Sequence, residues 1–456
     1  MIKSLMKTER IDMTQGNMTK TIFSYAVPLI VGSLLQNLFN ITDQIVLGQM
    51  AGGVAVASVG ACTTMVSLVI GFFVGLGAGA TVVLARAIGS KDDARAKNII
   101  STAMISAVGI GVVASCIALP CISPFLELTK CPSDCIDGAN IYASIYFLSV
   151  PAITVYNFGA STLQVTGDSR RPMTYIILAG AVNLVLNIIL CFILENKVIA
   201  VAAATVASQI LGAFLTVRRL TKLTESYRLE FRSLTFSKEI FGKIIRFGIP
   251  SGFNGSLFAL ANLQVQAGIN SYGSSAIAGH SAAISIESIV SAFISGFSVT
   301  TQTMVGQNLG AGNKERVKKS IVYLMRYSAS IVFVLSITIY FLRRPLVHLC
   351  VPEAAALEYA TLRMQHVLLW CVVNTYNNVL AGALNAFGYS AFTMIGNICS
   401  TIILRTFWMQ VIYPHFTSFR TIMLCYTAAW CTNAVLFSIA FAVVFSRYKK
   451  GKLIKM

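Results

Sequence analysis

The sequence predicts an all-α polytopic membrane protein, with twelve transmembrane helices in two pseudo-symmetric six-helix lobes around a central cavity. Three observations predict this fold class. Hydrophobic residues make up 56% of the 456 residues and charged residues only 11%, whereas a soluble domain carries roughly 25% charged residues. The hydrophobic residues are concentrated in long runs. The two halves of the chain also share short polar motifs at a constant offset.

The hydrophobic runs are long enough to cross a bilayer, whose core of about 30 Å requires roughly 20 residues of helix. They are too long for the alternating strands of an outer-membrane barrel. Polar segments between the runs mark the ends of the predicted spans. Successive loops between these spans then lie on alternate sides of the membrane. The spans are 20–47, 53–83, 96–120, 138–164, 172–194, 198–218, 243–269, 276–304, 317–342, 357–386, 391–413 and 421–446.

The positions of the basic residues predict the orientation. Of the 35 Lys and Arg residues, 26 lie in the segments that alternate to one side and only 5 in the loops of the other side. Basic residues favour the cytoplasmic side, so both termini are expected in the cytoplasm. The formal charge of +18 then reflects orientation and contact with anionic lipids rather than nucleic acid. The polar first twenty residues lack a cleavable signal-peptide pattern.

The longest inside loop divides the chain into two halves of six spans. The predicted organisation follows from this loop and from the polar ends of the chain. It comprises a cytoplasmic segment 1–19, a first lobe 20–220, a cytoplasmic loop 221–242, a second lobe 243–446 and a basic cytoplasmic tail 447–456.

The two halves resemble each other at an offset of 221 residues. Because six spans is an even number, both halves begin on the same side and the repeat is parallel. Two like lobes facing a central cavity is the arrangement that alternating access requires, so the repeat predicts a transporter. The matching pairs are Gly89 and Gly310, Arg95 and Arg316, Lys97 and Lys318, Asn157 and Asn378, Gly167 and Gly388, and, at nearly the same offset, Pro28 and Pro250.

Asp43 in the first span is the leading candidate for function, because an ionisable group at membrane depth is costly and seldom present without a role. Gln36 and Asn40 share its helical face. This face predicts a cavity, and a structural hydrogen-bond cluster is the alternative. Pro28 removes a backbone hydrogen bond, so this helix is expected to bend.

Other polar residues at membrane depth are further candidates. Asn183 and Asn187 lie one turn apart in the fifth span, and Thr205 and Gln209 repeat this spacing in the sixth; interhelical packing bonds are the alternative. Glu287 is the only acidic residue deep in the second half. It is expected either in the cavity or in an internal ion pair with Arg405 or Arg363. The remaining substrate-cavity candidates are Asn157, Asn374 and Asn378.

The sequence contains no P-loop, no G-x-S-x-G and no H-E-x-x-H, so no ATPase or hydrolase motif is present. We therefore expect no enzyme activity, no cofactor and no resident metal. Cys131 and Cys135 are either a disulfide or metal pair or two exposed loop thiols; the sequence favours exposed thiols, because no His or further Cys completes a ligand set. The partners expected are small organic substrates and membrane lipids, with no nucleic acid, and the chain is expected to be a monomer.

Three other classes of function are alternatives to a transporter. An intramembrane enzyme lacks its catalytic residues. A sensor or receptor with this topology usually carries a soluble domain, and none is evident. A lipid-linked-oligosaccharide flippase also needs two helical lobes, but its pyrophosphate cargo favours basic residues in the cavity. The first half has no Lys or Arg deep in a predicted span, which disfavours the flippase.

Three segments resemble the MATE (multidrug and toxic compound extrusion) transporter family. PLIVGSLLQNLFNITDQIVLG (28–48) resembles its first helix, LQVTGDSRRPM (163–173) the connection between its fourth and fifth helices, and VGQNLGAGNKERVKKS (305–320) the loop after its eighth helix. The likeness covers essentially the whole chain. It implies two lobes around a central cavity in the inner (plasma) membrane of a prokaryote. It also implies export of organic, often cationic, compounds driven by inward H⁺ or Na⁺.

By this resemblance, Asp43 matches the aspartate that binds the coupling cation, and Asn183 and Thr205 match further residues of that site. Asn187 departs from the family, since many prokaryotic members have Asp there. Phe258 stands where the sodium-coupled branch has an acid. Both departures point to a DinF-like, first-lobe mechanism. With fewer negative charges in the site, H⁺ is favoured as the coupling ion over Na⁺.

Overall fold

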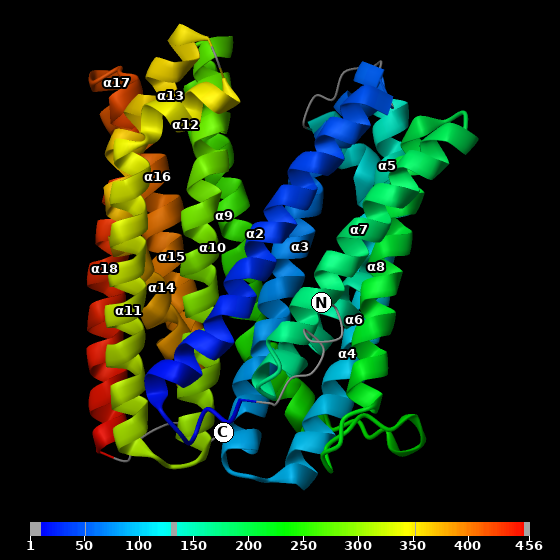
Figure 1. Cartoon of the computed structure of the whole chain (residues 1–456), viewed down its shortest axis with the longest axis vertical. Helices are drawn as coiled ribbons and strands as arrows, with labels where there is room; N and C mark the ends of the chain where they lie inside the picture. Colours follow the sequence, from blue (N-terminus) through cyan, green and yellow to red (C-terminus); the bar gives the residue numbers. More distant parts are fainter. Residues whose placement is uncertain (1–10, 51, 129–134, 352, 451–456) are drawn as a thin grey trace. The chain divides into compact units, whose positions relative to one another are not determined.

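The computed structural model describes residues 11–50, 52–128, 135–351 and 353–450; within them, the side chains of 40–50, 52–57, 64, 128, 258–260 and 263 are not described. All regular elements in these residues are helices (Figure 1). They form two compact units. The first contains Val31–Gly252, and the second contains Met13–Ile30 and the chain from Phe253 onward. The units therefore differ from the predicted lobes in two helices, α2 (Met18–Met50) and α9 (Lys238–Asn270), which are each divided between them.

The first unit contains most of α2, six further helices and the start of α9. The break between α5 and α6 falls at Ser149, two residues before Pro151, and bends this pair by 47°. The pair covers the span predicted at 138–164. The elements between α2 and α9 are α3 (Gly52–Gly89), α4 (Asp93–Leu128), α5 (Ile136–Leu148), α6 (Val150–Val165), α7 (Arg170–Ile193), α8 (Lys197–Thr221) and a 3₁₀ turn (Phe231–Ser233).

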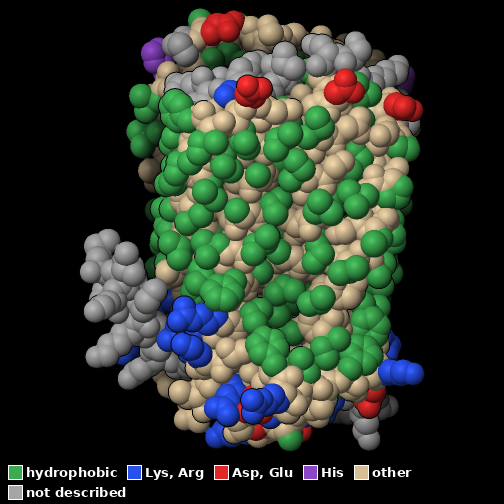
Figure 2. Space-filling view, turned by 90° about the vertical axis from the view of Figure 1, so that its right-hand side faces the viewer, with side chains coloured by type: hydrophobic (Ala, Val, Ile, Leu, Met, Phe, Trp, Pro, Cys, Tyr) green, Lys and Arg blue, Asp and Glu red, His purple; other side chains and the backbone are tan. Residues whose placement is uncertain are grey.

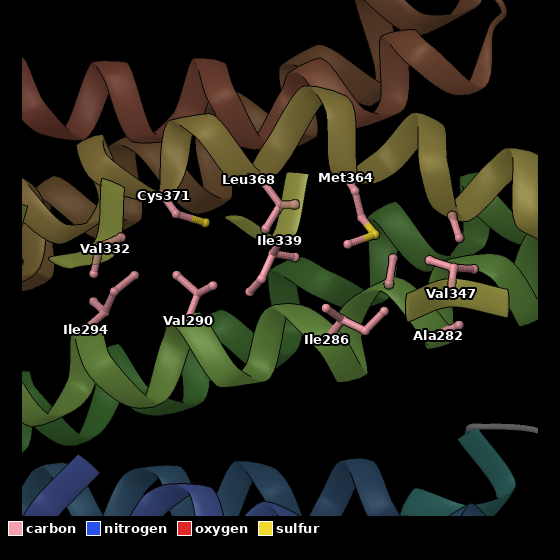
Figure 3. Packing of buried hydrophobic residues seen from close by; sticks show 12 residues of the cluster. Ala282, Ile286, Val290, Ile294, Val332, Ile339, Val347, Met364, Leu368 and Cys371 are labelled. Carbon is pink, nitrogen blue, oxygen red and sulfur yellow. The ribbon is translucent and has the colours of Figure 1, made fainter. Parts of the chain in front are cut away.

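The second unit continues from α9 through nine further α-helices. One cluster of its core lies between α10, α11 and α13, where Val290, Ile294 and Met364 pack with other apolar side chains (Figure 3). The helices are α10 (Ser274–Gly310), α11 (Lys314–Phe341), α12 (Arg343–Cys350), α13 (Ala354–Val367), α14 (Cys371–Ala386), α15 (Ser390–Asn397), α16 (Leu404–Phe407), α17 (Tyr413–His415) and α18 (Phe419–Lys449). A 3₁₀ turn (Leu368–Trp370) joins α13 to α14, and two π-helical turns (Ile398–Ile403 and Trp408–Ile412) flank α16.

Among the described residues, ten helices are long and apolar enough to cross a membrane, or eleven with the bent pair α5 and α6. Helix α9 coincides with the remaining predicted span, 243–269, and is 33 residues long. On the face drawn in Figure 2, hydrophobic side chains cover the middle, Lys and Arg gather at the lower end and Asp and Glu at the upper end. This distribution is that of a protein whose middle contacts lipid.

The internal repeat is visible in the local structure of each half. Lys91 and Gly312, 221 residues apart, have positive φ angles of 57° and 69°. Each precedes a residue whose side chain caps the next helix. Asp92 accepts from the backbone N–H of Arg95 at 3.0 Å, and Asn313 accepts from that of Arg316 at 3.0 Å. Gly167 and Gly388 also share a positive φ, at 87° and 83°. The two halves therefore end and restart their helices in the same way.

Glycines allow the start of α9 to pack directly on α3 in the first unit. A Cβ at Gly75 would lie 2.2 Å from the carbonyl oxygen of Ser251, and one at Gly79 would lie 2.5 Å from the Cα of Gly248. In the second unit, a Cβ at the equivalent Gly296 would lie 2.5 Å from the Cγ1 of Ile30. Close backbone approach through small residues is a common way for membrane helices to pack.

We predict that Gly75→Ala destabilises the protein, because the added Cβ meets backbone that cannot rotate away. Overpacking of this kind costs about 1–3 kcal/mol. Gly60→Ala in the same helix is the matched control, since nothing lies within 4 Å of a Cβ there, and helix propensity should then favour Ala by about 0.5–1 kcal/mol. Thermal unfolding of the two purified variants should give shifts of opposite sign. Equal shifts would show that the α3–α9 contact is looser than described.

Glu230 anchors the segment between α8 and α9 through ion pairs and hydrogen bonds. Its carboxylate accepts from Lys97 Nζ at 2.7 Å, Arg228 Nε at 2.7 Å and Ser233 Oγ at 2.9 Å. These bonds, that of Lys97 first, lower the pKa of Glu230 from 4.5 to about 2. The Glu230 side chain is 33% exposed, so solvent screens the interaction and its effect on stability is small.

We predict that this segment loosens in acid. A carboxyl group whose pKa is lower in the folded state stabilises that state above its unfolded pKa, and this contribution is lost as pH falls through the folded value. The loss should therefore occur between about pH 4.5 and pH 2. The protection of residues 222–237 from hydrogen exchange, relative to the intrinsic exchange rate at each pH, should fall over this window, and Glu230→Gln should show the lowered protection already at pH 7. Protection that does not change with pH in the parent and is the same in Glu230→Gln would contradict the role of Glu230.

Candidate functional site

A small polar cavity of about 230 Å³ lies in the first unit between α2, α5, α6, α7 and α8. Its polar side chains come from three of these helices. Gln36 is on α2, Asn183 on α7, and Thr205, Ser208 and Gln209 on α8. The described lining contains no charged side chain. At the depth of a membrane span, such polar side chains are expected to face one another or water rather than lipid.

A chain of hydrogen bonds links α7 to α8 at this cavity. The amide of Asn187 donates to Oδ1 of Asn183 at 3.2 Å, and the amide of Asn183 donates to Oγ1 of Thr205 at 3.5 Å. Thr205 in turn donates to the carbonyl oxygen of Val201 at 3.0 Å. Asn187 is 2% exposed, and Asn183 and Thr205 are half-buried. The structure thus brings together three of the four residues predicted for the coupling site.

Aromatic rings and glycines form much of the remaining wall. A Cβ at Gly180 of α7 would lie 3.0 Å from the ring of Phe39, and one at Gly212 of α8 would lie 3.4 Å from the ring of Tyr156. The absence of side chains at these positions lets the rings approach the two helices. A side chain at Gly180 would have to displace the Phe39 ring, whereas a Cβ at Gly212 would be in ordinary contact with the Tyr156 ring.

Asp43 and Asn40 belong to the predicted site, but their side chains lie outside the described residues. The backbone that carries them is helical, as part of α2. Gln36, on the same predicted helical face, lines the cavity.

The remaining predicted cavity residues make local contacts elsewhere. The amide of Asn157 on α6 donates to the carbonyl of Ile153 at 2.8 Å. In the second unit, the amide of Asn378 donates to Oδ1 of Asn374 at 3.0 Å, so these two lie together on α14. None of the three lines the cavity of the first unit.

Glu287 forms an internal ion pair, which is one of the two arrangements left open by the sequence. Its Oε1 accepts from Arg363 Nε at 3.0 Å and its Oε2 accepts from Arg363 Nη2 at 2.7 Å. Glu287 is 8% exposed and Arg363 is 4% exposed. The partner is Arg363 and not Arg405. A buried carboxylate held by both oxygens in this way has little charge left to attract a substrate.

The sequence did not identify every residue of the cavity wall. Tyr156 and Ser208 line it, but neither carries a formal charge, and nothing in the sequence distinguishes them from other residues of a transmembrane helix. Gln209 was noted for its spacing from Thr205 and was not assigned to the site. Gly180 and Gly212, which lie opposite Phe39 and Tyr156, are the sequence signals of a close approach at this wall.

Two repeated units of membrane-length helices, one of which contains a polar cavity at span depth, have the architecture of a multi-pass membrane transporter. The chain belongs to the MatE family, whose pattern matches residues 28–193 and 250–408. It is similar to the probable multidrug resistance protein YpnP of Bacillus subtilis, with 24% identity and coverage of 98% of each chain. It is also similar to an FAD transporter of Shewanella oneidensis, with 22% identity and coverage of 84% of this chain and 86% of the relative.

Solved structures agree with the fold. An outward-facing multidrug resistance MATE family transporter matches with a TM-score of 0.87 and 22% identity, over 97% of this chain and 98% of the other. The family identifies the protein as a multidrug-type efflux transporter with many transmembrane helices, and confirms the fold class predicted from the sequence.

Proposed function

We propose that the protein exports amphiphilic organic compounds by alternating access, in exchange for H⁺, and that the coupling site lies in the first unit. Asp43, Asn183, Asn187 and Thr205 form this site, and Gln36 and Asn40 line the approach to it. The observation that carries the proposal is the hydrogen-bond chain from Asn187 through Asn183 to Thr205 beside the polar cavity. Gln36, which shares the helical face of Asp43, lines the same cavity.

Proton coupling fits the chemistry of these side chains. Amide and hydroxyl groups both donate and accept, so they can bond a carboxyl group in either protonation state. Asp43 would then be the single charge beside a cavity whose described lining is neutral. Its carboxylate attracts a cation, and protonation releases that cation. Na⁺ is the alternative ion, since amide and hydroxyl oxygens also ligate it, but it gains from more negative charge than one carboxylate provides.

A preference for cationic substrates rests on Asp43 alone, because Glu287 is paired with Arg363. The relatives differ in cargo, one being named for multidrug resistance and another for FAD, so the family does not fix the substrate. The flippase alternative gains no support, since the described lining of the cavity contains no basic residue.

Expression in a pump-deficient host tests the proposed function. Growth against a panel of cationic dyes and antimicrobials should improve with the intact protein, and this protection should disappear when the proton and sodium gradients are both collapsed. Protection that survives the collapse would contradict secondary transport.

We also propose that the protein is a monomer in the inner membrane of a prokaryote and that both of its termini lie in the cytoplasm. A single cysteine at position 230, in a background without the native cysteines, should react with an impermeant maleimide only after the cells are opened. Reaction from the outside of intact cells would reverse the proposed threading.

A further inference from the structure

The second unit buries more positive than negative charge. Arg363 is 4% exposed and Arg405 is 2% exposed, whereas Glu287 is the one carboxylate beside them. His280 adds no charge, because its Nδ1 lies 3.3 Å from Nη1 of Arg363. A guanidinium group only donates, so this ring nitrogen must accept and is therefore unprotonated. The cluster consequently has a net charge of one positive unit.

The unbalanced charge belongs to Arg405. Its Nη1 donates to Oδ1 of Asn262 on α9 at 3.0 Å, and its Cζ lies 4.5 Å from the centre of the Tyr426 ring. The Cζ of Arg363 lies 4.8 Å from the same ring centre, so both guanidinium groups make a cation–π contact with the Tyr426 ring. The Nε of Arg405 is buried and has no hydrogen-bond partner among the described residues.

No carboxylate is hidden next to Asn262 on α9. The side chains of that helix that are not described are Phe258, Ala259, Leu260 and Leu263, which carry no charge. Within the described part of the chain, Arg405 forms no ion pair at all, while Arg363 takes both oxygens of Glu287. Burying an unpaired charge is costly, and a cation–π contact and one neutral hydrogen bond offset only part of that cost.

The backbone around Arg405 is unusual in the same place. It belongs to the four-residue helix α16, which lies between two π-helical turns. Such turns are rare and frequently lie at functional sites. On the side of α9, Asn262 and Gln264 are exposed, and Gln264 accepts from Thr406 at 2.7 Å. Exposed amides at span depth are expected to face water rather than lipid.

We propose that Arg405, with Asn262, forms an oxyanion-binding site in the second unit, which takes a carboxylate or phosphate group. The planar guanidinium group presents paired N–H donors that match two oxygens of such a group. The bound anion supplies the negative charge that the cluster lacks and gives Nε a partner. This site goes beyond the proposed coupling site, since it lies in the other unit and its occupancy does not depend on Asp43.

The test measures thermal unfolding of the full-length protein, purified in a neutral detergent, as sodium phosphate or sodium acetate replaces sodium chloride at constant ionic strength. The intact protein should show a saturable rise in midpoint, of about 2–8 °C near saturation. Arg405→Gln should lose this rise, and in chloride alone it should be at least as stable as the parent because a buried charge has been removed. Arg405→Lys should bind about tenfold more weakly, since it keeps the charge and loses the paired donors.

Arg420→Gln, at an exposed position on α18, is the matched control and should keep the full rise. Asp43→Asn should keep it as well, which separates this site from the proposed coupling site. A second arm adds phosphatidylglycerol to the detergent; a rise seen only there would assign the phosphate to a lipid headgroup. The proposal is overturned by an equal rise in Arg405→Gln, or by the lack of any rise in the parent with phosphate, acetate and phosphatidylglycerol. Should Arg405→Gln not fold, unchanged affinity in Arg405→Lys would overturn it instead.

Discussion

Asp43→Asn should abolish coupled efflux and leave the protein folded. Asparagine keeps the size and hydrogen-bonding capacity of the side chain but cannot gain or lose a proton, so substrate and proton no longer compete for one group. In everted vesicles, addition of a transported dye should dissipate the pH gradient for the parent and have no effect for the variant. Loss of activity should be about a hundredfold or more, because the described lining of the cavity carries no charge that could take the place of Asp43.

Asn187→Asp is the matched gain of charge at the same site. Asn187 is 2% exposed and bonds Asn183, so a carboxylate there would lie within the hydrogen-bond chain. Two carboxylates that share a site hold a proton to higher pH than one does. Efflux should therefore shift its optimum upward or gain stimulation by sodium. Parent efflux that follows the sodium gradient and ignores pH would overturn proton coupling.

The hydropathy of the chain was sufficient to predict the spans, because lipid-facing helices must be apolar along their whole length. The repeat was equally visible, since the motifs at an offset of 221 residues are helix ends whose caps and glycines require particular residues. The predicted ranges agree with the helices except in detail, as at α5 and α6, where one predicted span is bent at Ser149.

The divisions of α2 and α9 between the units were not predictable in this way. They depend on contacts such as that of Gly75 with Ser251, which join residues far apart in the sequence. The same reason applies to the π-helical turns beside Arg405. A π turn inserts one residue into a helix without changing its composition, so it leaves no mark on a hydropathy pattern.

The sequence predicted the polar residues of the candidate site but not the aromatic and glycine residues that form the cavity wall. Asn183, Asn187 and Thr205 were identified because polar residues one turn apart on neighbouring spans are conspicuous. The choice between the two roles of Glu287 was not decidable, since Arg363 and Arg405 are both buried basic residues of the same half. Which of them meets the carboxylate depends on how α10, α13 and α16 are rotated, and only the structure fixes that.

Glu287→Gln should destabilise the protein by about 3–5 kcal/mol, because it leaves Arg363 buried without its counter-charge. The two side chains are 8% and 4% exposed and share two hydrogen bonds, so solvent cannot replace the lost partner. Arg405 would make the loss worse, since it faces the same Tyr426 ring and would leave two unbalanced cations in one cluster. Thermal and denaturant unfolding of the purified variant would measure the effect. Glu239→Gln, which breaks an exposed pair with Lys243, is the control and should change stability little.

The double variant Glu287→Met with Arg363→Met separates the ion pair from the packing. Replacing a buried pair by apolar side chains of similar volume is often neutral or stabilising, so the double variant should recover most of the stability lost in Glu287→Gln. Its efflux should also exceed that of Asp43→Asn, because the pair is assigned to the structure of the second unit and not to coupling. If Glu287→Gln folded normally and abolished efflux while Asp43→Asn remained active, the coupling site would lie in the second unit. Glu287 would then have to bind and release the coupled proton, and its ion pair with Arg363 would be the deprotonated state in that cycle.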